Sequence, residues 1–168
     1  MSNAVHEHRL ASPTVLTVLV VTVSDTRTLE TDASGALIAE LATAAGHRVM
    51  GRVIVPDEPA RIRDEVERGV EAGVDAILLT GGTGMSPRDR TPEALEPLWT
   101  RVLPGFGELF RWLSYQEIGA ACILSRAIGG LVGRTVVLAL PGSRAAVELA
   151  MRAIILPELP HMVRESRK

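Results

Sequence analysis

Four segments rich in valine, leucine and isoleucine recur along the chain, and each is followed by a short polar segment. They cover residues 14–23, 47–55, 75–79 and 135–140. Largely apolar runs of this length are typical of strands that are buried on both faces of a parallel sheet. We therefore predict strands at these four ranges, of which those at 14–23, 75–79 and 135–140 are expected to be buried.

Segments with helical signals separate the predicted strands. Gly46 and Gly73 follow the first two of these segments and suit the left-handed position that ends a helix. Gly129 and Gly130 are predicted to form a turn, and Pro157 is predicted to end the last full helix. The predicted helices cover approximately residues 31–45, 59–72, 92–101, 108–117 and 143–155.

The alternation of strands with helices predicts an α/β protein. Such a chain forms a three-layer, doubly wound and mostly parallel sheet with helices on both faces. Because crossovers between parallel strands are right-handed, we expect the strands to run in the same direction. No internal repeat, low-complexity segment or interdomain linker divides the chain, so residues 14–168 are expected to form a single domain.

Residues 1–13 are polar and end at Pro13, and we expect them to form a flexible arm outside the domain. Met1–Ala4 resembles a cloning scar and is left out of the reasoning about the fold. His6 and His8 have a spacing that could ligate a metal, but a solvated tail is the simpler interpretation.

Composition and charge argue against several classes of protein. Aromatic residues make up 3% of the chain, the net charge is −2 and no basic run occurs, so we expect no nucleic-acid partner. No uninterrupted apolar segment reaches transmembrane length and the N-terminus lacks a signal pattern, so we expect a cytoplasmic protein with no membrane partner. The only cysteine, Cys122, excludes an internal disulfide. The only lysine, Lys168, excludes a Schiff base or a P-loop lysine within the fold.

The strongest chemical signal is the stretch from Thr80 to Glu93, TGGTGMSPRDRTPE. It follows the predicted strand at 75–79 and leads into a helix with Thr91 as the predicted N-cap. Its glycines allow backbone N–H groups to turn inward and approach an anion closely. A glycine-rich turn alone is equally consistent with a tight turn. The combination of glycines, acids and arginines favours a phosphate-binding loop.

Charged residues in the same stretch strengthen this interpretation. Asp89 could hold a magnesium ion against bound phosphates, since hard cations prefer oxygen ligands. Arg88 and Arg90 add positive charge on either side of it. The loop is therefore a candidate site for a phosphate group together with its magnesium ion.

The other strand ends also carry polar residues. Ser24-Asp25-Thr26-Arg27 follows the first strand, Pro56-Asp57-Glu58 the second and Pro141-Gly142-Ser143 the fourth. Strands that run in one direction place these segments and the glycine loop at one edge of the sheet, where open α/β sheets bind ligands. The alternative is that the segments are turns and caps. The residue types alone favour Asp57 as a helix cap, and Ser143 can cap the last helix.

The features that the loops lack narrow the class of ligand. The turn at residues 24–27 has no glycine, so it lacks the G-x-G-x-x-G pattern of NAD sites. An FMN site is a closer competitor, but it lacks aromatic rings to stack on the flavin. Tyr115 is the only tyrosine, and Trp99 and Trp112 fall in predicted helical segments. No histidine falls on a predicted site loop, which argues against a Ser-His-Asp hydrolase.

Seven motifs, in their order along the chain, resemble the MoaB/Mog family of molybdenum-cofactor biosynthesis proteins. The similarity extends from about Thr14 to Met162, and residues 110–119 and 156–162 are nearer the MoaB branch. The resemblance implies a molybdopterin-binding-type domain. The motifs are VSDTR at 23–27, DASG at 32–35, PDE at 56–58, the stretch at 80–93, PGFGE at 104–108, LSRA at 124–127 and LPGS at 140–143.

The resemblance implies that the protein binds molybdopterin and adenylylates its terminal phosphate with Mg-ATP. In that reaction the pterin phosphate attacks the α-phosphorus of ATP, and pyrophosphate leaves. The resemblance assigns catalysis and magnesium binding to Asp57 and Asp89. Contacts to pterin or nucleotide are expected from Ser24, Asp25, Arg27, Gly81, Gly82, Thr83, Gly84, Ser86, Gly142 and Ser143.

The resemblance also bears on partners and on the alternative to catalysis. It implies a homotrimer or homohexamer, with residues 106–113 as a candidate contact surface, although burial in the monomer explains these residues as well. Other enzymes of the pathway are candidate partners. The alternative to an enzyme is a non-catalytic molybdopterin-binding or scaffold protein. The sequence PRDRTPE at 87–93 is similar to the active branch and favours the enzyme.

Overall fold

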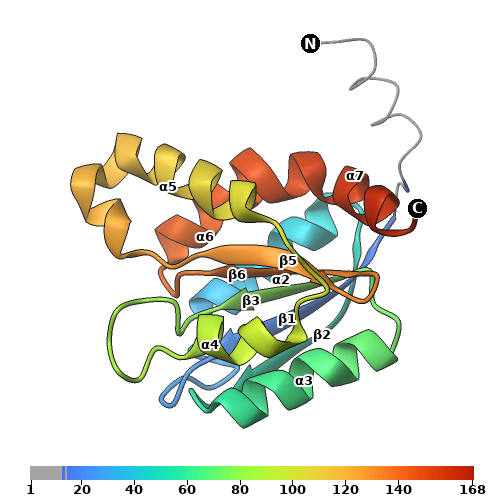
Figure 1. The fold of residues 1–168 in the computed structure, drawn as a ribbon, viewed down its shortest axis with the longest axis horizontal. Coiled ribbons are helices and arrows are strands. Elements are labelled where there is room, and N and C mark those ends of the chain that lie inside the picture. Colours follow the sequence, from blue (N-terminus) through green and yellow to red (C-terminus); the bar gives the residue numbers. More distant parts are fainter. Residues whose placement is uncertain (1–12, 14) are drawn as a thin grey trace.

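The computed structural model describes residue 13 and residues 15–168; residues 1–12 of the arm predicted at 1–13, with His6 and His8, lie outside the described residues. The strands are β1 (Thr17–Val23), β2 (Arg48–Val55), β3 (Ala76–Thr80), β4 (Arg101–Val102), β5 (Ile128–Val132) and β6 (Thr135–Leu140). They form one sheet in the order β2-β1-β3-β6-β5-β4 (Figure 1). The four predicted strands pair in parallel, whereas β5 is antiparallel to β6, and β4 to β5.

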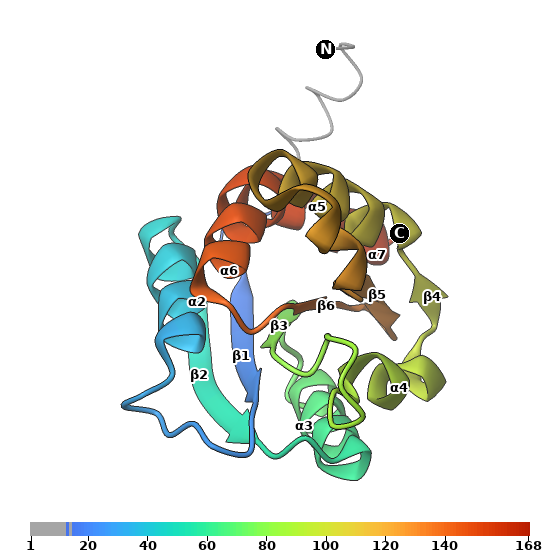
Figure 2. The same cartoon turned by 90° about the vertical axis from the view of Figure 1, so that its left-hand side faces the viewer.

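Helices cover both faces of this sheet. They are α2 (Ala33–Ala44), α3 (Pro59–Glu71), α4 (Thr91–Leu95), α5 (Pro104–Ile118), α6 (Arg144–Ala150) and α7 (Leu156–Ser166), with 3₁₀ segments η1 (Glu96–Leu98) and η2 (Gly119–Leu124) and a π-helical turn η3 (Met151–Ile155). Figures 1 and 2 show α2, α5, α6 and α7 on one face and α3 and α4 on the other. The α/β architecture with a mostly parallel sheet is therefore confirmed.

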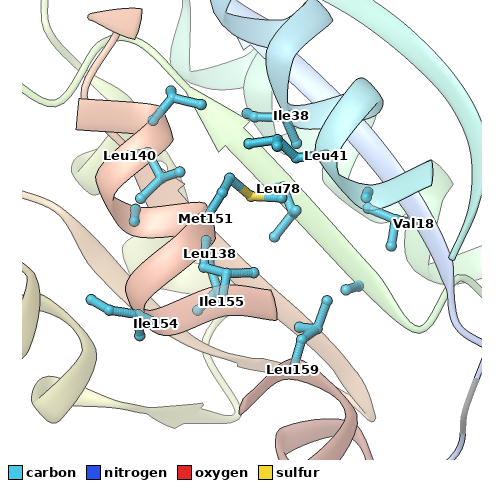
Figure 3. Close-up of a cluster of buried hydrophobic side chains, with 14 of the residues drawn as sticks. Val18, Ile38, Leu41, Leu78, Leu138, Leu140, Met151, Ile154, Ile155 and Leu159 are labelled. Carbon is cyan, nitrogen blue, oxygen red and sulfur yellow. The ribbon is translucent and has the colours of Figure 1, made fainter. Parts of the chain in front are cut away.

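The central strands bury side chains on both faces, which accounts for the apolar runs in the sequence. In β1, Val18 and Val20 join a core cluster under α2, α6 and α7, whereas Leu19 and Val21 join a second cluster under α3. Figure 3 shows part of the first cluster, in which Met151 points from the helical layer toward the strands. Because both faces are packed, the carboxyl ends of these strands have fixed positions.

The antiparallel pair of β4 and β5 is not predicted by the sequence pattern, and the expectation that all strands run in one direction is wrong at this edge. Gly129 and Gly130 lie within β5 rather than in a turn. A Cβ on Gly129 would lie 2.5 Å from Leu138 Cδ2, and a Cβ on Gly130 would lie 2.4 Å from the carbonyl oxygen of Arg101. These glycines therefore allow close approach within a sheet, which is a known use of glycine in strands.

Proline positions account for two differences between the predicted and observed helices. α5 begins at Pro104 rather than near residue 108, since proline suits the first turn of a helix. Pro157 does not end the last helix, because η3 joins α6 directly to α7 and Pro157 lies in the first turn of α7. The helix predicted at 92–101 is shorter, because η1 ends at Leu98.

No helix in the part of the chain that the structure describes is long and apolar enough to cross a membrane.

Candidate functional site

The polar segments at the four strand ends meet at one edge of the sheet, as the sequence predicts. The strand order reverses between β1 and β3, because the chain passes from β1 to β2 on one side and then to β3 on the other. The Asp57 amide donates to Asp25 Oδ1 at 3.1 Å, and Thr80 Oγ1 donates to the carbonyl oxygen of Pro141 at 2.9 Å. In Figure 2 the loops that follow β1 and β3 face the viewer from this edge.

Two glycines at the end of β3 let the loop pass very close to its neighbours. Gly81 and Gly82 have positive φ angles of 103° and 63°. A Cβ on Gly81 would lie 2.2 Å from the carbonyl oxygen of Val23, and a Cβ on Gly82 would lie 2.6 Å from Asp57 Oδ1 and 2.4 Å from Thr91 Oγ1. The loop therefore touches the end of β1, the segment after β2 and the start of α4 at once.

Thr91 binds the loop and is not the helix cap that the sequence predicts. Its Oγ1 donates to the carbonyl oxygen of Gly81 and its N–H donates to the carbonyl oxygen of Gly82, both at 2.9 Å. The side chain is fully buried. The Gly81 amide donates to the carbonyl oxygen of Leu140 at 3.0 Å and so continues the pairing of β3 with β6. This N–H is therefore not available to an anion. The amides of the following residues remain the candidates for phosphate contact.

Two hollows lie beside this loop. The larger has a volume of about 410 Å³ and is lined by the loop, by the segment after β6 and by a largely apolar wall from α5 and η2 that includes Ile118, Cys122 and Leu124. The smaller has a volume of about 160 Å³, and its lining is mostly polar, with Ser24, Arg27, Asp32 and Ser34 among its residues. Gly81 and Gly142 line both hollows, so the two are neighbours.

Asp57 is an acid of this edge whose pKa is raised. Burial raises the pKa of its carboxyl above the ordinary value, and the nearby carboxylates of Asp25 and Asp89 act in the same direction. A hydrogen bond from the Arg90 backbone and the charge of Arg88 oppose this shift. Asp57 Oδ1 is buried without a hydrogen-bond partner in the described part of the chain. Asp57 is also not the helix cap that its residue type favours, since Glu58 occupies that position.

The loop itself brings Asp89 next to these groups. Asp89 Oδ2 accepts a hydrogen bond from the Ser86 amide at 2.8 Å and would lie 2.8 Å from a Cβ on Gly84. Asp25 forms an ion pair with Arg88, whose hydrogen bond lowers the pKa of the Asp25 carboxyl. Three acids from three different segments therefore share one neighbourhood, and the charge of Arg88 acts on both Asp25 and Asp57.

The carboxylates of this edge fit magnesium better than a metal held by protein alone. No group of three or more His, Cys, Asp or Glu side chains arranged to hold a metal occurs among residues 13 and 15–168. Mg²⁺ usually takes one or two carboxylates and completes its octahedral shell with substrate phosphates and water. Asp57, with an unpartnered oxygen, and Asp89 match that pattern.

Three predicted contact residues also have local structural roles. Ser24 Oγ accepts hydrogen bonds from the amides of Thr26 and Arg27, each at 3.2 Å, and so holds its own turn. Arg27 Nη1 donates to the carbonyl oxygen of Thr31 at 2.7 Å. Ser143 is the N-cap of α6, accepting from the Ala146 amide, as the cap interpretation predicts. Ser24 and Arg27 line the smaller hollow and Ser143 lines the larger one, so these roles coexist with a position at the site.

Arg126 binds the glycine loop, a role that the sequence does not predict. It lies between η2 and β5 and contacts the loop through both its side chain and its backbone. It also pairs with Glu93 of α4. Although partial burial acts to raise the pKa of the Glu93 carboxyl, the hydrogen bond from Arg126 brings it below its usual value. The only feature of the sequence that pointed to Arg126 was its position in the LSRA motif.

Comparison with known proteins finds close similarity over almost the whole chain. Residues 19–161 match the family MoCF_biosynth, described as "Probable molybdopterin binding domain". The chain is similar to molybdenum cofactor biosynthesis protein B of Bacillus subtilis (strain 168), with 50% identity over 171 residues and 98% of each chain covered. A crystal structure of molybdenum cofactor biosynthesis protein B is similar with a TM-score of 0.89 and 49% identity, over 93% of this chain and 98% of that chain. The crystal structure of the tungsten cofactor synthesizing protein MoaB from Pyrococcus furiosus is similar with a TM-score of 0.85 and 35% identity, over 94% and 100%.

Proposed function

Because the chain belongs to the family described as "Probable molybdopterin binding domain", we propose that it binds molybdopterin and transfers AMP from Mg-ATP to the terminal phosphate of the pterin. The comparisons confirm the resemblance to MoaB/Mog proteins, nearer the MoaB branch, and support a role in molybdenum cofactor biosynthesis. The observation that carries adenylyl transfer is the placement of two carboxylates, Asp57 and Asp89, against one glycine loop.

The two hollows suit the two kinds of group that the substrates carry. The larger has an apolar wall, which suits a flat ring system such as a pterin or an adenine. The smaller offers the Arg27 guanidinium and the Ser24 hydroxyl, which suit phosphate oxygens. Gly81 and Gly142 line both hollows, so a phosphate that spans them would pass beside the glycine loop.

The reaction requires alignment and charge neutralisation more than covalent help from the protein. An oxygen of the pterin phosphate forms a bond to the α-phosphorus of ATP, the bond from that phosphorus to the bridging oxygen breaks, and pyrophosphate leaves. The amides of Gly82, Thr83 and Gly84 would hold phosphate oxygens, and Asp57 and Asp89 would hold magnesium. A bound magnesium ion neutralises charge on the phosphates and orients them for in-line attack.

A non-catalytic molybdopterin-binding or scaffold protein remains the alternative function. One observation favours it: Asp89 Oδ2 already accepts the Ser86 amide, so this acid has a structural use within its own loop. The two functions differ in turnover. The enzyme releases pyrophosphate only when both ATP and molybdopterin are present, whereas a binding protein takes up the pterin without consuming ATP.

The pH dependence of the reaction should follow Asp57. Only the ionised carboxylate binds magnesium, and burial raises the pKa of this group above the ordinary 3.8. We therefore expect kcat/KM to fall as the pH decreases through that raised pKa, at a higher pH than an ordinary aspartate would give. A pH profile of kcat/KM at a fixed, sub-saturating magnesium concentration measures this limb, because saturating magnesium would itself hold the carboxylate ionised.

The same pKa shift predicts an opposite effect on stability. Between 3.8 and the raised pKa the folded state binds more protons than the unfolded state, so this group lowers stability as the pH rises through that window. Above the window, Asp57→Asn should therefore unfold at a higher temperature than wild type while losing activity. An acid limb at the ordinary carboxylate pKa together with a destabilised variant would contradict the assigned role of Asp57.

We further propose that the protein assembles through α5, as a homotrimer or homohexamer. Phe106 and Phe110 on this helix are buried in the monomer, but Leu109 and Trp112 are 43% and 62% exposed. Burial within one chain therefore does not account for the latter pair. Analytical ultracentrifugation of wild type beside Trp112→Glu would test the surface, since a charge there should shift the protein toward monomer.

A further inference from the structure

Arg126 connects three parts of the site through one guanidinium group. Its Nε donates to the carbonyl oxygen of Gly84 at 2.8 Å, and its Nη2 donates to the carbonyl oxygen of Asp89 at 2.7 Å. Its Nη1 pairs with the Glu93 carboxylate, and its backbone N–H donates to the carbonyl oxygen of Thr83 at 2.9 Å. The beginning of the loop, its end and helix α4 are therefore held by one residue.

We propose that Arg126 is a positioning residue for adenylyl transfer, which fixes the glycine loop with its amides and Asp89 in the geometry that the transfer requires. It does not need to touch either substrate. The effect of Arg126 on the reaction rate rests on the proposed function. Its effect on the geometry of the loop does not depend on that function.

Peptide geometry explains how contacts to carbonyl groups orient amides. In a trans peptide the C=O of one residue and the N–H of the next point in opposite directions, and every described peptide bond is trans. Because Arg126 binds the carbonyl oxygens of Thr83 and Gly84, the N–H groups of Gly84 and Met85 point away from it. Thr91 orients the two preceding peptides in the same manner.

The chemistry of the side chain makes arginine difficult to replace at this position. A guanidinium group presents its donors in a fixed planar fork, whereas the ammonium group of lysine is a point charge on a flexible stem. Three different nitrogens of Arg126 reach three different acceptors. A lysine keeps the charge and can satisfy only part of this set. The side chain is 29% exposed, so water competes only partly for these acceptors.

The test compares Arg126→Gln and Arg126→Lys with a matched control, Arg111→Lys. Arg111 Nη1 donates to the carbonyl oxygens of Ser125 and Ala127, so it supports the same segment without touching the loop. Hydrogen exchange, followed by mass spectrometry, reports on a peptide covering residues 84–90. This peptide contains the amides of Ser86 and Asp89, which are hydrogen-bonded within the loop.

In Arg126→Gln we expect that peptide to exchange about tenfold faster, since the loop loses its charge-assisted contacts. Exchange in β1 should not change. With ATP and molybdopterin as substrates, kcat should fall about 100-fold, as expected when reacting groups lose alignment, while the Kd for molybdopterin stays the same. Arg126→Lys should recover part of both effects, and Arg111→Lys should show neither.

Wild-type exchange of the loop peptide in both Arg126 variants would overturn the inference, as would equal effects in Arg111→Lys. If Arg126→Gln fails to fold, Arg126→Lys tests the inference by the same two measurements, the exchange of the loop peptide and kcat. If the wild-type protein does not turn over ATP, the proposed function fails. The exchange measurement then still confirms or overturns the role of Arg126 in holding the loop.

Discussion

Asp89→Asn is expected to lower the rate of adenylyl transfer on the order of 10³-fold while the fold and molybdopterin binding remain intact. The asparagine side chain retains an oxygen that can accept the Ser86 amide, so the loop keeps its internal hydrogen bond. The negative charge is lost, and with it a magnesium ligand. The loss should therefore appear in kcat and in the magnesium concentration needed for half-maximal rate.

A matched control separates this effect from a general change in charge. Asp64 lies exposed on α3, and Asp64→Asn removes one negative charge there. This variant should retain the wild-type rate. If Asp89→Asn also retained the full rate, the assignment of Asp89 to the magnesium ion would be wrong, and its bond to Ser86 would be its whole role.

Gly82→Ala is expected to destabilise the fold by about 3 kcal/mol and to abolish activity in the protein that remains folded. Gly82 has a φ of 63°, a left-handed conformation that disfavours alanine. The added Cβ would also lie 2.4 Å from Thr91 Oγ1 and 2.6 Å from Asp57 Oδ1, so the loop must shift away from both. For a chain of this size the midpoint of thermal unfolding should decrease by roughly 6–12 °C.

Substitutions at two other glycines separate the cost of a positive φ from the cost of the steric clash in Gly82→Ala. Gly46 has a φ of 87° with open space where a Cβ would lie, so Gly46→Ala measures the conformational cost alone, about 1 kcal/mol. Gly105 has open space and no positive φ, so Gly105→Ala should change little. A loss of stability in Gly82→Ala no larger than that in Gly46→Ala would show that Thr91 and Asp57 do not enclose the loop.

The features that the sequence predicts well are those that leave a periodic or local signal. The three central strands β1, β3 and β6, buried on both faces, give apolar runs, and the rules for right-handed crossovers bring the ends of the parallel strands together. The positions of Asp57, Gly81 and Ser143 at one edge follow from this topology. Ser143 was also predictable as a cap, because capping depends only on neighbouring residues.

The features that the sequence does not predict depend on contacts between distant segments. β4 has two exposed residues and β5 contains two glycines, so neither gives the apolar run of a buried strand. Thr91 has the residue type of an N-cap, yet its side chain binds a carbonyl ten residues earlier. Arg126 lies 33 residues from Glu93 and 42 from Gly84, a separation at which residue spacing carries no information.

The central claim is that this site transfers AMP to molybdopterin, and the fate of labelled ATP tests it most directly. Purified protein is incubated with molybdopterin, magnesium and ATP that is radiolabelled either at the α-phosphorus or at the γ-phosphorus. The α-label is expected to move to the pterin and the γ-label to pyrophosphate, and neither should move without the pterin. Tight pterin binding with both labels still in ATP would contradict this claim and would favour the binding or scaffold function.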